Sequence, residues 1–450
     1  MRSRAAIVAA LLVCGTAGAG AQVPSTPAET PPAPAGSPLP PTGTLPGGVA
    51  YELRADPAQS AAAVALWYRA PSAGFDAAPT PGLARLAATT VAASTPITGT
   101  PLSGLVARYG GRLFVDGYPN SVSITALVPP DRVAATVRAM TGDYFAPVVT
   151  AAGLQAGLAD STEDALLRSV SDDAIEDALG AALFASGPLH DGSIGTREGL
   201  ANAGLDRVRA FAQRAFRPSN AILVLTGNVD ASVLANVATR AGTTGVESPE
   251  PGPVQSARPA PATRRIDGYS VGDGLAWIGP PIADEADATS MDFLADALFA
   301  PRTGAVPKAL GELKAAVRGT FVTYHNPGIF IVTITGDDAA TARPIVERTI
   351  AAATKPLAPA AFAAARAAFV YDLLSDMDSP SSVADTYGWY AVEGDPSYAP
   401  AEGGLQGRYF HLVGTLTPAG VARTAVKYLG VAPAVVVENK RAPADTRTGT

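Results

Sequence analysis

Residues of the types that hold metals or act as nucleophiles are few and scattered in this chain. The chain contains three histidines, His190, His325 and His411, which lie far apart in the sequence. The only cysteine is Cys14. A catalytic metal needs several imidazole, thiolate or carboxylate ligands at one place. The histidines would therefore form a metal site only if the fold brought distant segments together, and we do not expect this.

Motifs of other enzyme classes are absent from the sequence. It has no Gly-x-Ser-x-Gly elbow, no Gly-x-x-x-x-Gly-Lys-Ser/Thr loop and no dinucleotide-binding fingerprint. A Ser-His-Asp triad assembled from distant segments stays open. The acidic clusters at 172–173 and 284–287 lack the ordered spacing of a calcium loop. We expect them at helix N-termini, where the helix dipole favours negative charge.

The composition limits the classes of partner. The 450 residues suggest two to three domains, and 47% are hydrophobic, so a large core is possible. The net charge of −7 argues against a nucleic-acid partner, which would favour a basic surface.

The N-terminus has the pattern of a secretory signal peptide. Arg2 and Arg4 precede an apolar run over 5–13, and the small residues at 19–21 follow. We expect cleavage before Gln22 and a periplasmic or secreted protein. A retained anchor is the alternative, but the apolar run is short for a membrane span.

A lipoprotein anchored at Cys14 is a second alternative. Val13 stands directly before this cysteine, where a small residue would be expected. After cleavage the mature chain has no cysteine, which suits an oxidising compartment.

The elements expected in the first half are repeated in the second half. The first half reads as a strand, two helices, a hairpin and a helix, at 63–68, 82–93, 101–109, 112–128 and 131–145. The second half reads in the same order, at 275–279, 288–300, 307–315, 319–335 and 340–353. Pro-rich segments precede the first half and separate the two, so the sequence predicts a duplicated domain.

Three local motifs accompany this duplication. They are Pro81-Gly82-Leu83-Ala84, then Tyr109-Gly110-Gly111 before a hairpin, and Pro218-Ser219-Asn220 followed by Gly227. With the repeated element order, they resemble the insulinase-like (pitrilysin) metallopeptidases, which are built on an inverted zinc motif, His-x-x-Glu-His.

The resemblance implies an α+β fold of two homologous domains, each a mostly antiparallel sheet with helices packed on one face. The expected organisation is a signal peptide at 1–21, a flexible leader at 22–44, an N-terminal domain at 45–244, a linker at 245–264, a C-terminal domain at 265–440 and a mobile tail at 441–450.

The zinc motif itself is missing. In such peptidases it directly follows the Gly-Leu-Ala triplet, and here those positions hold Arg85, Ala88 and Thr89 in place of the two histidines and the glutamate. A further zinc-binding glutamate, about 75 residues on, falls near Glu163 and Asp164, which we interpret as solvated helix charges. We therefore expect no catalytic residues, no metal and no cofactor in this chain.

A second family feature is also degenerate. Active relatives grip the substrate with an arginine and, seven residues later, a tyrosine. Here these positions hold Lys314 and Phe321, which keep a charge and a ring but lose the planar guanidinium and the hydroxyl. A contact with substrate or partner through Lys314 and Phe321 is one hypothesis, and an ordinary structural role is the other.

Three functions are compatible with these features. The first is an exported, inactive homologue that serves as the non-catalytic subunit of a zinc-bearing peptidase of the same family and shapes a peptide-binding chamber. The second is a stand-alone, homodimeric peptide-binding module. The third is a residual peptidase that uses other chemistry.

Overall fold

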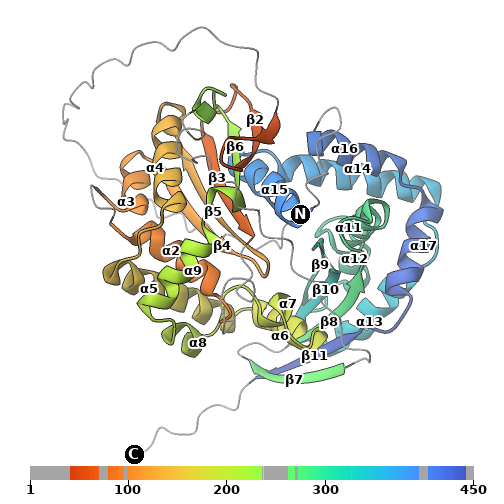
Figure 1. Ribbon diagram of the computed structural model, residues 1–450. Coiled ribbons are helices and arrows are strands. Elements are labelled where there is room, and N and C mark those ends of the chain that lie inside the picture. Colours follow the sequence, from red (N-terminus) through yellow and green to blue (C-terminus); the bar gives the residue numbers. More distant parts are fainter. Residues whose placement is uncertain are drawn as a thin grey trace, which may run out of the picture.

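The protein consists of two halves, residues 41–235 and 262–441, each built on one β-sheet (Figure 1). The computed structural model describes residues 41–69, 80–95, 99–235, 237, 262–268, 272–325, 327–394 and 404–441. Within these residues no helix is long and apolar enough to span a bilayer.

The sheet of the first half has six strands, of which only β2 and β6 pair in parallel. Their spatial order is β1 (Thr42–Thr44), β2 (Ala50–Ala55), β6 (Ala221–Gly227), β3 (Ala62–Arg69), β5 (Ser121–Val128) and β4 (Arg112–Gly117). The central strands β3 and β6 are buried along nearly their whole length, which explains their continuous apolar sequences.

The sheet of the second half has five strands, of which only β7 and β11 pair in parallel. Their spatial order is β7 (Ala262–Gly268), β11 (Val435–Arg441), β8 (Gly272–Gly279), β10 (Gly328–Thr335) and β9 (Ala316–Val322). The hairpin of β9 and β10 corresponds to the hairpin of β4 and β5 in the first half.

The helices of the first half form a layer on one face of its sheet, except α6 and α7, which pack on the second sheet. They are α2 (Leu83–Ala93), α3 (Leu102–Arg108), α4 (Val133–Phe145), α5 (Ala151–Ser169), α6 (Asp173–Leu183), α7 (Pro188–Asp191), α8 (Arg197–Ala201) and α9 (Leu205–Ala215), with short 3₁₀ turns at Pro130–Arg132 and Pro218–Asn220. Leu86 of α2, Val137 of α4 and Phe211 of α9 belong to one core cluster with Leu66 and Leu223 of the sheet.

The second half repeats this layer with all of its described helices except α15, which packs on the first sheet. Its helices are α11 (Glu285–Phe299), α12 (Ala305–Leu310), α13 (Ala339–Ala352), α14 (Pro359–Asp376), α15 (Pro380–Glu393), α16 (Gly404–Thr415) and α17 (Pro418–Leu429). Met291 of α11, Val346 of α13 and Ala425 of α17 pack with Leu275 and Phe330 of the sheet. The predicted α+β fold of two homologous domains is confirmed.

The opposite face of each sheet is covered by one helix from the other half. Ala384 and Tyr387 of α15, from the second half, pack with Ala65 and Val224 of the first sheet. Conversely, α6 of the first half covers the second sheet, where Ile175 approaches so closely that a Cβ on Gly274 would clash. Because the exchange is reciprocal, the core of each half depends on the other half.

Two predicted boundaries differ from the structure. Thr42–Thr44 form β1 although they were assigned to the leader, and β7 begins at Ala262 although the linker was expected to reach 264. Each short segment pairs with the edge of a neighbouring strand, β1 with β2 and β7 with β11. Amino-acid composition does not reveal such pairing. The signal peptide, the rest of the leader and linker, and residues 442–450 lie outside the described residues.

Candidate functional site

Two glycines set the position of α2, the helix at which the zinc motif would lie. Gly82 precedes α2 with φ 79°, and Gly195 also has φ 79°. A Cβ on Gly82 would strike the carbonyl oxygen of Ile194, and one on Gly195 would strike the carbonyl of Pro81. Only glycine permits both the left-handed backbone and this close approach, so the Gly-Leu-Ala triplet has a structural role independent of any metal.

Helix α2 packs closely against α5 through small residues. Gly153, Gly157 and Ser161 recur every four residues on α5, so they lie along one helix face. A Cβ on Gly157 would lie 2.7 Å from the hydroxyl of Thr90 on α2. This spacing brings α5 close enough for its side chains to reach the positions of the lost zinc motif.

Arg85 joins the two helices by charge. Its side chain is 8% exposed, and Nη2 lies 3.0 Å from Oδ2 of Asp160 and also contacts Oδ2 of Asp164. Nη1 donates to the hydroxyl of Ser161 at 3.2 Å. Asp164, near which the resemblance places the further zinc ligand, is one of the two carboxylates that contact Arg85. The guanidinium of Arg85, at the first position of the missing zinc motif, thus lies between the two helices.

The carboxylates of this site are partly solvated. The side chains of Asp160 and Asp164 are 51% and 39% exposed. Burial raises the pKa of Asp164; the charge of Arg85 opposes this rise, and the neighbouring Asp160 and Glu163 add to it. Glu163 is exposed, in agreement with the interpretation as a solvated charge. Asp164 is also partly solvated, and in addition it forms an ion pair with Arg85.

Ala88 and Thr89 offer no catalytic group. Ala88 is fully buried, and its carbonyl accepts a hydrogen bond of 2.8 Å from the hydroxyl of Tyr144. The hydroxyl of Thr89 donates to the carbonyl of Arg85 at 3.0 Å. Across the described part of the chain, no three His, Cys, Asp or Glu side chains lie close enough to hold a metal ion.

Lys314 and Phe321 lie on the second half but differ in accessibility. Lys314 is exposed, just before β9, and its backbone N–H donates to Asp338 at 2.7 Å. Phe321 is 1% exposed and packs against Gly279 and Gly328 in the core. A ring buried in this way cannot contact a peptide unless the sheet rearranges, whereas the amine of Lys314 is accessible.

The junction between the halves contains a second polar site, which the sequence analysis did not find. Glu393, at the end of α15, is 1% exposed. Its Oε2 accepts from the backbone N–H of His325 at 2.9 Å and from the amide of Asn120 at 3.4 Å, while Oε1 has no partner among the described residues. Burial raises the pKa of Glu393 to about 7, although the hydrogen bonds and the charge of Arg69 oppose the rise.

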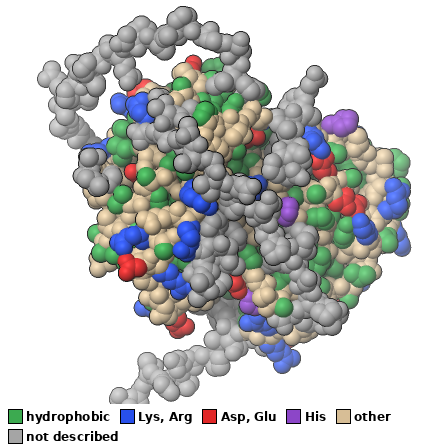
Figure 2. Space-filling view, in the orientation of Figure 1, with side chains coloured by type: hydrophobic (Ala, Val, Ile, Leu, Met, Phe, Trp, Pro, Cys, Tyr) green, Lys and Arg blue, Asp and Glu red, His purple; other side chains and the backbone are tan. Residues whose placement is uncertain are grey.

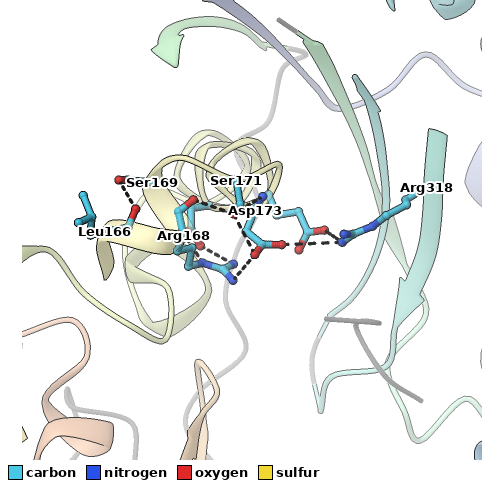
Figure 3. Close-up of polar contacts among 8 residues, drawn as sticks. Leu166, Arg168, Ser169, Ser171, Asp173 and Arg318 are labelled. Carbon is cyan, nitrogen blue, oxygen red and sulfur yellow. Dashed lines mark hydrogen bonds and ion pairs between the residues drawn. The ribbon is translucent and has the colours of Figure 1, made fainter. Parts of the chain in front are cut away.

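Ion pairs connect the halves at a further place, where α6 meets β9. Figure 3 shows Arg168, at the end of α5, beside Asp173 of α6, and Arg318 reaching the same helix from the second half. Arg318 binds Glu176 at 2.7 Å, and Arg168 binds Asp177 at 2.6 Å. On the described part of the face drawn in Figure 2, basic and acidic side chains are interspersed and form no continuous basic surface.

Comparison with known families gives a match that spans both halves. Residues 202–368 match the family model described as the peptidase M16 inactive domain. This segment begins directly after α8 and runs through β6 and four strands of the second sheet, β7 to β10, into α14. No curated protein matches the chain significantly by sequence.

Solved structures of similar fold cover nearly the whole chain. A protease from Helicobacter pylori has a TM-score of 0.75 at 15% identity, with 89% of this chain and 98% of that chain covered. A putative M16-like peptidase from Alicyclobacillus acidocaldarius has a TM-score of 0.73 at 16% identity, covering 89% and 98%. A peptidase M16 inactive domain from Pseudomonas fluorescens has a TM-score of 0.74 at 15% identity, covering 90% and 98%.

At these identities the structural likeness establishes the fold, and the family model adds the match over residues 202–368. Together they confirm the resemblance of this chain to the insulinase-like, or M16, peptidases.

Proposed function

We propose that this protein is an exported, catalytically inactive M16 peptidase homologue that acts as the non-catalytic subunit of a zinc-bearing peptidase of the same family. The observation that carries the proposal is the guanidinium of Arg85 between Asp160 and Asp164. The site retains the contact between two helices and replaces the metal ion with a side chain.

The charges of this site disfavour zinc. Arg85 already places a positive charge between Asp160 and Asp164, so a divalent cation there would be repelled by the guanidinium or would have to displace it. Hydrolysis by a metal-bound water also needs a general base, and the buried methyl group of Ala88 cannot accept a proton. The same arrangement explains how α2 and α5 keep their packing without a metal.

The partner role is inferred from what the chain retains. Both halves of the chain keep the fold, although the positions of the zinc motif carry no catalytic groups. This supports a role in which the protein provides a binding surface, such as one wall of a peptide-binding chamber. Zinc would then be supplied only by the partner. The charged and apolar N-terminal pattern supports export to the periplasm or the medium.

Co-purification tests the proposal. The tagged protein, isolated from its own host, should bring down a stoichiometric homologue with an intact His-x-x-Glu-His motif. Peptide hydrolysis should appear only with both chains present and should stop when a chelator is added. The protein purified alone serves as the control and should cleave nothing and contain no stoichiometric zinc.

Three outcomes would contradict the proposal in different ways. If no homologue is recovered, and peptides stabilise the protein without being cleaved, the stand-alone binding module is correct. If the protein alone cleaves peptides in the presence of a chelator, it is a residual peptidase with other chemistry. If it contains stoichiometric zinc, the site at Arg85 has been misinterpreted.

A further inference from the structure

The carboxyl group of Glu393 lies where three segments of the chain meet. Helix α15 packs on the first sheet (Figure 1), and its end contacts the turn between β4 and β5 and the segment that follows β9. Oε2 of Glu393 accepts from the side-chain amide of Asn120 on the turn and from the backbone N–H of His325 on the segment. One buried carboxyl group therefore holds the turn of the first half against the segment of the second half.

This carboxyl group has no cation in contact with it among the described residues. The guanidinium of Arg69 faces the same end of α15, but it donates to the backbone carbonyls of Ala391 and Val392, each at 2.9 Å. Oε1 of Glu393 has no partner in the described part of the chain. Because a buried carboxylate without a compensating charge is strongly disfavoured, the closed junction favours the protonated form. The pKa of Glu393, which burial raises to about 7, agrees with this geometry.

The other titratable groups around Glu393 do not supply the missing charge. Burial, and after it the charge of Glu393, raise the pKa of Tyr324 well above its ordinary value, so this tyrosine stays neutral. Nδ1 of His325 lies 3.1 Å from the backbone carbonyl oxygen of Glu393 and does not contact the carboxylate. Asp385, about two turns earlier on α15, accepts from the hydroxyl of Tyr118 at 3.1 Å. Beyond Tyr324 lie the ion pairs Arg168–Asp177 and Arg318–Glu176.

Buried polar atoms without partners line the same junction. The hydroxyls of Ser121 and Ser123 on β5 and the indole N–H of Trp67 on β3 have no hydrogen-bond partner in the described chain. The register of these strands sets Ser123 opposite Trp67, on the sheet face that α15 covers. The hydroxyl of Thr323, whose carbonyl accepts from Trp389, is a fourth such group. Groups of this kind bind water readily, so water that reaches the carboxyl group finds partners here.

We propose that the end of α15, the β4–β5 turn and the segment after β9 form a latch that is closed when Glu393 is protonated and opens to water when Glu393 is ionised. The two cores stay folded in the open latch, because Leu66 and Phe330 pack on the opposite faces of their sheets. The inference does not rest on the proposed partner role, since the latch joins two halves of one chain.

The sign of the pH dependence follows from proton binding. In the open latch the hydrated carboxyl group has the ordinary pKa of a glutamate, whereas in the closed latch burial raises its pKa to about 7. Between these values the open form binds fewer protons than the closed form, so a rise in pH favours opening. We expect the opening equilibrium to increase by at least about tenfold from pH 5 to pH 8.

Hydrogen exchange followed by mass spectrometry, and corrected for the intrinsic exchange rate at each pH, measures this opening. The backbone N–H groups of His325 and Ser121 report on the latch. Those of Phe330 and Val332 on β10, which is paired on both sides, report on unfolding of the core. Protection of the latch amides should fall by at least about tenfold from pH 5 to pH 8, and it should lie at least about tenfold below that of the core amides throughout.

Two variants identify the group that operates the latch. Glu393→Gln should abolish the pH dependence at the latch amides, because an amide of the same size does not ionise. His325→Gln is the matched control, since histidine is the other side chain here that titrates near neutral pH. It should retain the pH dependence, because His325 meets the carboxyl group only through its backbone N–H.

Three results would overturn the proposal. Latch amides as protected as the core amides would show that the junction opens only when the whole chain unfolds. Protection of the latch amides that is independent of pH in the unmodified protein would show that Glu393 does not control opening. A pH dependence lost in His325→Gln and kept in Glu393→Gln would assign the control to the imidazole. None of these results affects the test for a zinc-bearing partner.

Discussion

The contact of α2 with α5 and the junction between the halves both bury charged groups, but they compensate the charge differently. At the first, the guanidinium of Arg85 meets two carboxylates that are half solvated. At the second, the carboxylate of Glu393 is 1% exposed and has two neutral hydrogen-bond donors, with the charge of Arg69 acting only from a distance. The first site places a cation between its carboxylates, whereas at the second burial raises the pKa of Glu393 to about 7 and so favours binding of a proton.

This difference has a consequence for stability. An ion pair with water access contributes modestly and changes little near neutral pH. A buried carboxyl without a cationic partner favours its protonated form, so its contribution depends on pH. We therefore expect the α2–α5 contact to be insensitive to pH and the junction to be sensitive.

Replacing Trp389 by alanine should have the largest effect. Trp389 of α15 is 7% exposed, contacts Tyr118 of the first half and Tyr324 of the second, and donates its indole N–H to the carbonyl of Thr323 at 3.1 Å. Its removal leaves a large cavity at the junction. We expect a loss of about 4 kcal/mol in the free energy of unfolding, measured by urea denaturation.

The same variant should also uncouple the halves. Trp67 and Trp277 remain as fluorescent reporters of the first and the second half, and they should report separate transitions. Phe362→Ala, in the second core away from the junction, is the matched control and should keep a single transition. Coincident transitions in Trp389→Ala would show that the exchanged helices do not couple the halves through this residue.

The next largest effect should come from Glu393 and depend on pH. Because its folded pKa is raised to about 7 and a glutamate in the unfolded chain titrates near 4.5, the folded state binds more protons between these values. Stability is therefore greatest below about pH 4.5 and falls as the pH rises to 7, by on the order of 3 kcal/mol.

Glu393→Gln removes this titration. It should match the unmodified protein at pH 4.5 and exceed it in unfolding free energy at pH 8, since an amide needs no proton to stay neutral. Equal differences between the two proteins at both pH values would show that Glu393 does not titrate as the geometry implies. Asp292→Asn serves as the comparison, because Asp292 is a buried carboxyl of the second core, away from the junction. A pH dependence that is lost only in Glu393→Gln belongs to the junction, and one that is lost in both variants is a general effect of buried acids.

Arg85→Ala should have a smaller effect than the pH-dependent change at Glu393, and this effect should vary little near neutral pH. It removes the cation between Asp160 and Asp164 and leaves the two carboxylates facing each other. Because these are half exposed, we expect a loss of about 2 kcal/mol, less than for a fully buried pair. Arg132→Ala, at an exposed ion pair with Asp131, should change stability by less than about 0.5 kcal/mol. If Arg85→Ala lowered the free energy of unfolding by as little as Arg132→Ala does, the ion pairs of Arg85 would not hold α2 and α5 together.

A metal chelator should have the smallest effect. Structural zinc contributes roughly 10 kcal/mol or more in the proteins that need it, so an unchanged melting temperature in a chelator is an informative result. The triple variant Arg85→His/Ala88→Glu/Thr89→His should bind zinc weakly, if at all, and should not cleave peptides alone, because a glutamate at position 88 would replace a fully buried alanine. Tight zinc binding with peptidase activity in this variant would contradict the interpretation.

The sequence by itself determined the local elements and the loss of the zinc motif. The period-two pattern over 121–128 gave β5 with the observed bounds, and the small apolar residues over 82–93 gave α2 to within a residue. The repeated order of elements indicated two similar domains, since periodicity and turn residues depend on neighbours in the chain. The residues at 85, 88 and 89 showed, without any coordinates, that the His-x-x-Glu-His motif is absent at these positions.

Only the tertiary structure decided which surfaces meet. Periodicity reveals that a helix has an apolar face but not which sheet covers it, so the exchange of α6 and α15 was not predictable. Helix α15, with Trp389 and Glu393, is buried on several sides and lacks a clear amphipathic pattern, and the sequence analysis left it unassigned. Likewise, the spacing in the sequence pointed to Glu163 and Asp164, but the ion pairs of Arg85 with Asp160 and Asp164 follow from the close approach that Gly153 and Gly157 allow. Charge compensation between distant segments depends on distance and burial, and the folded chain alone fixes these.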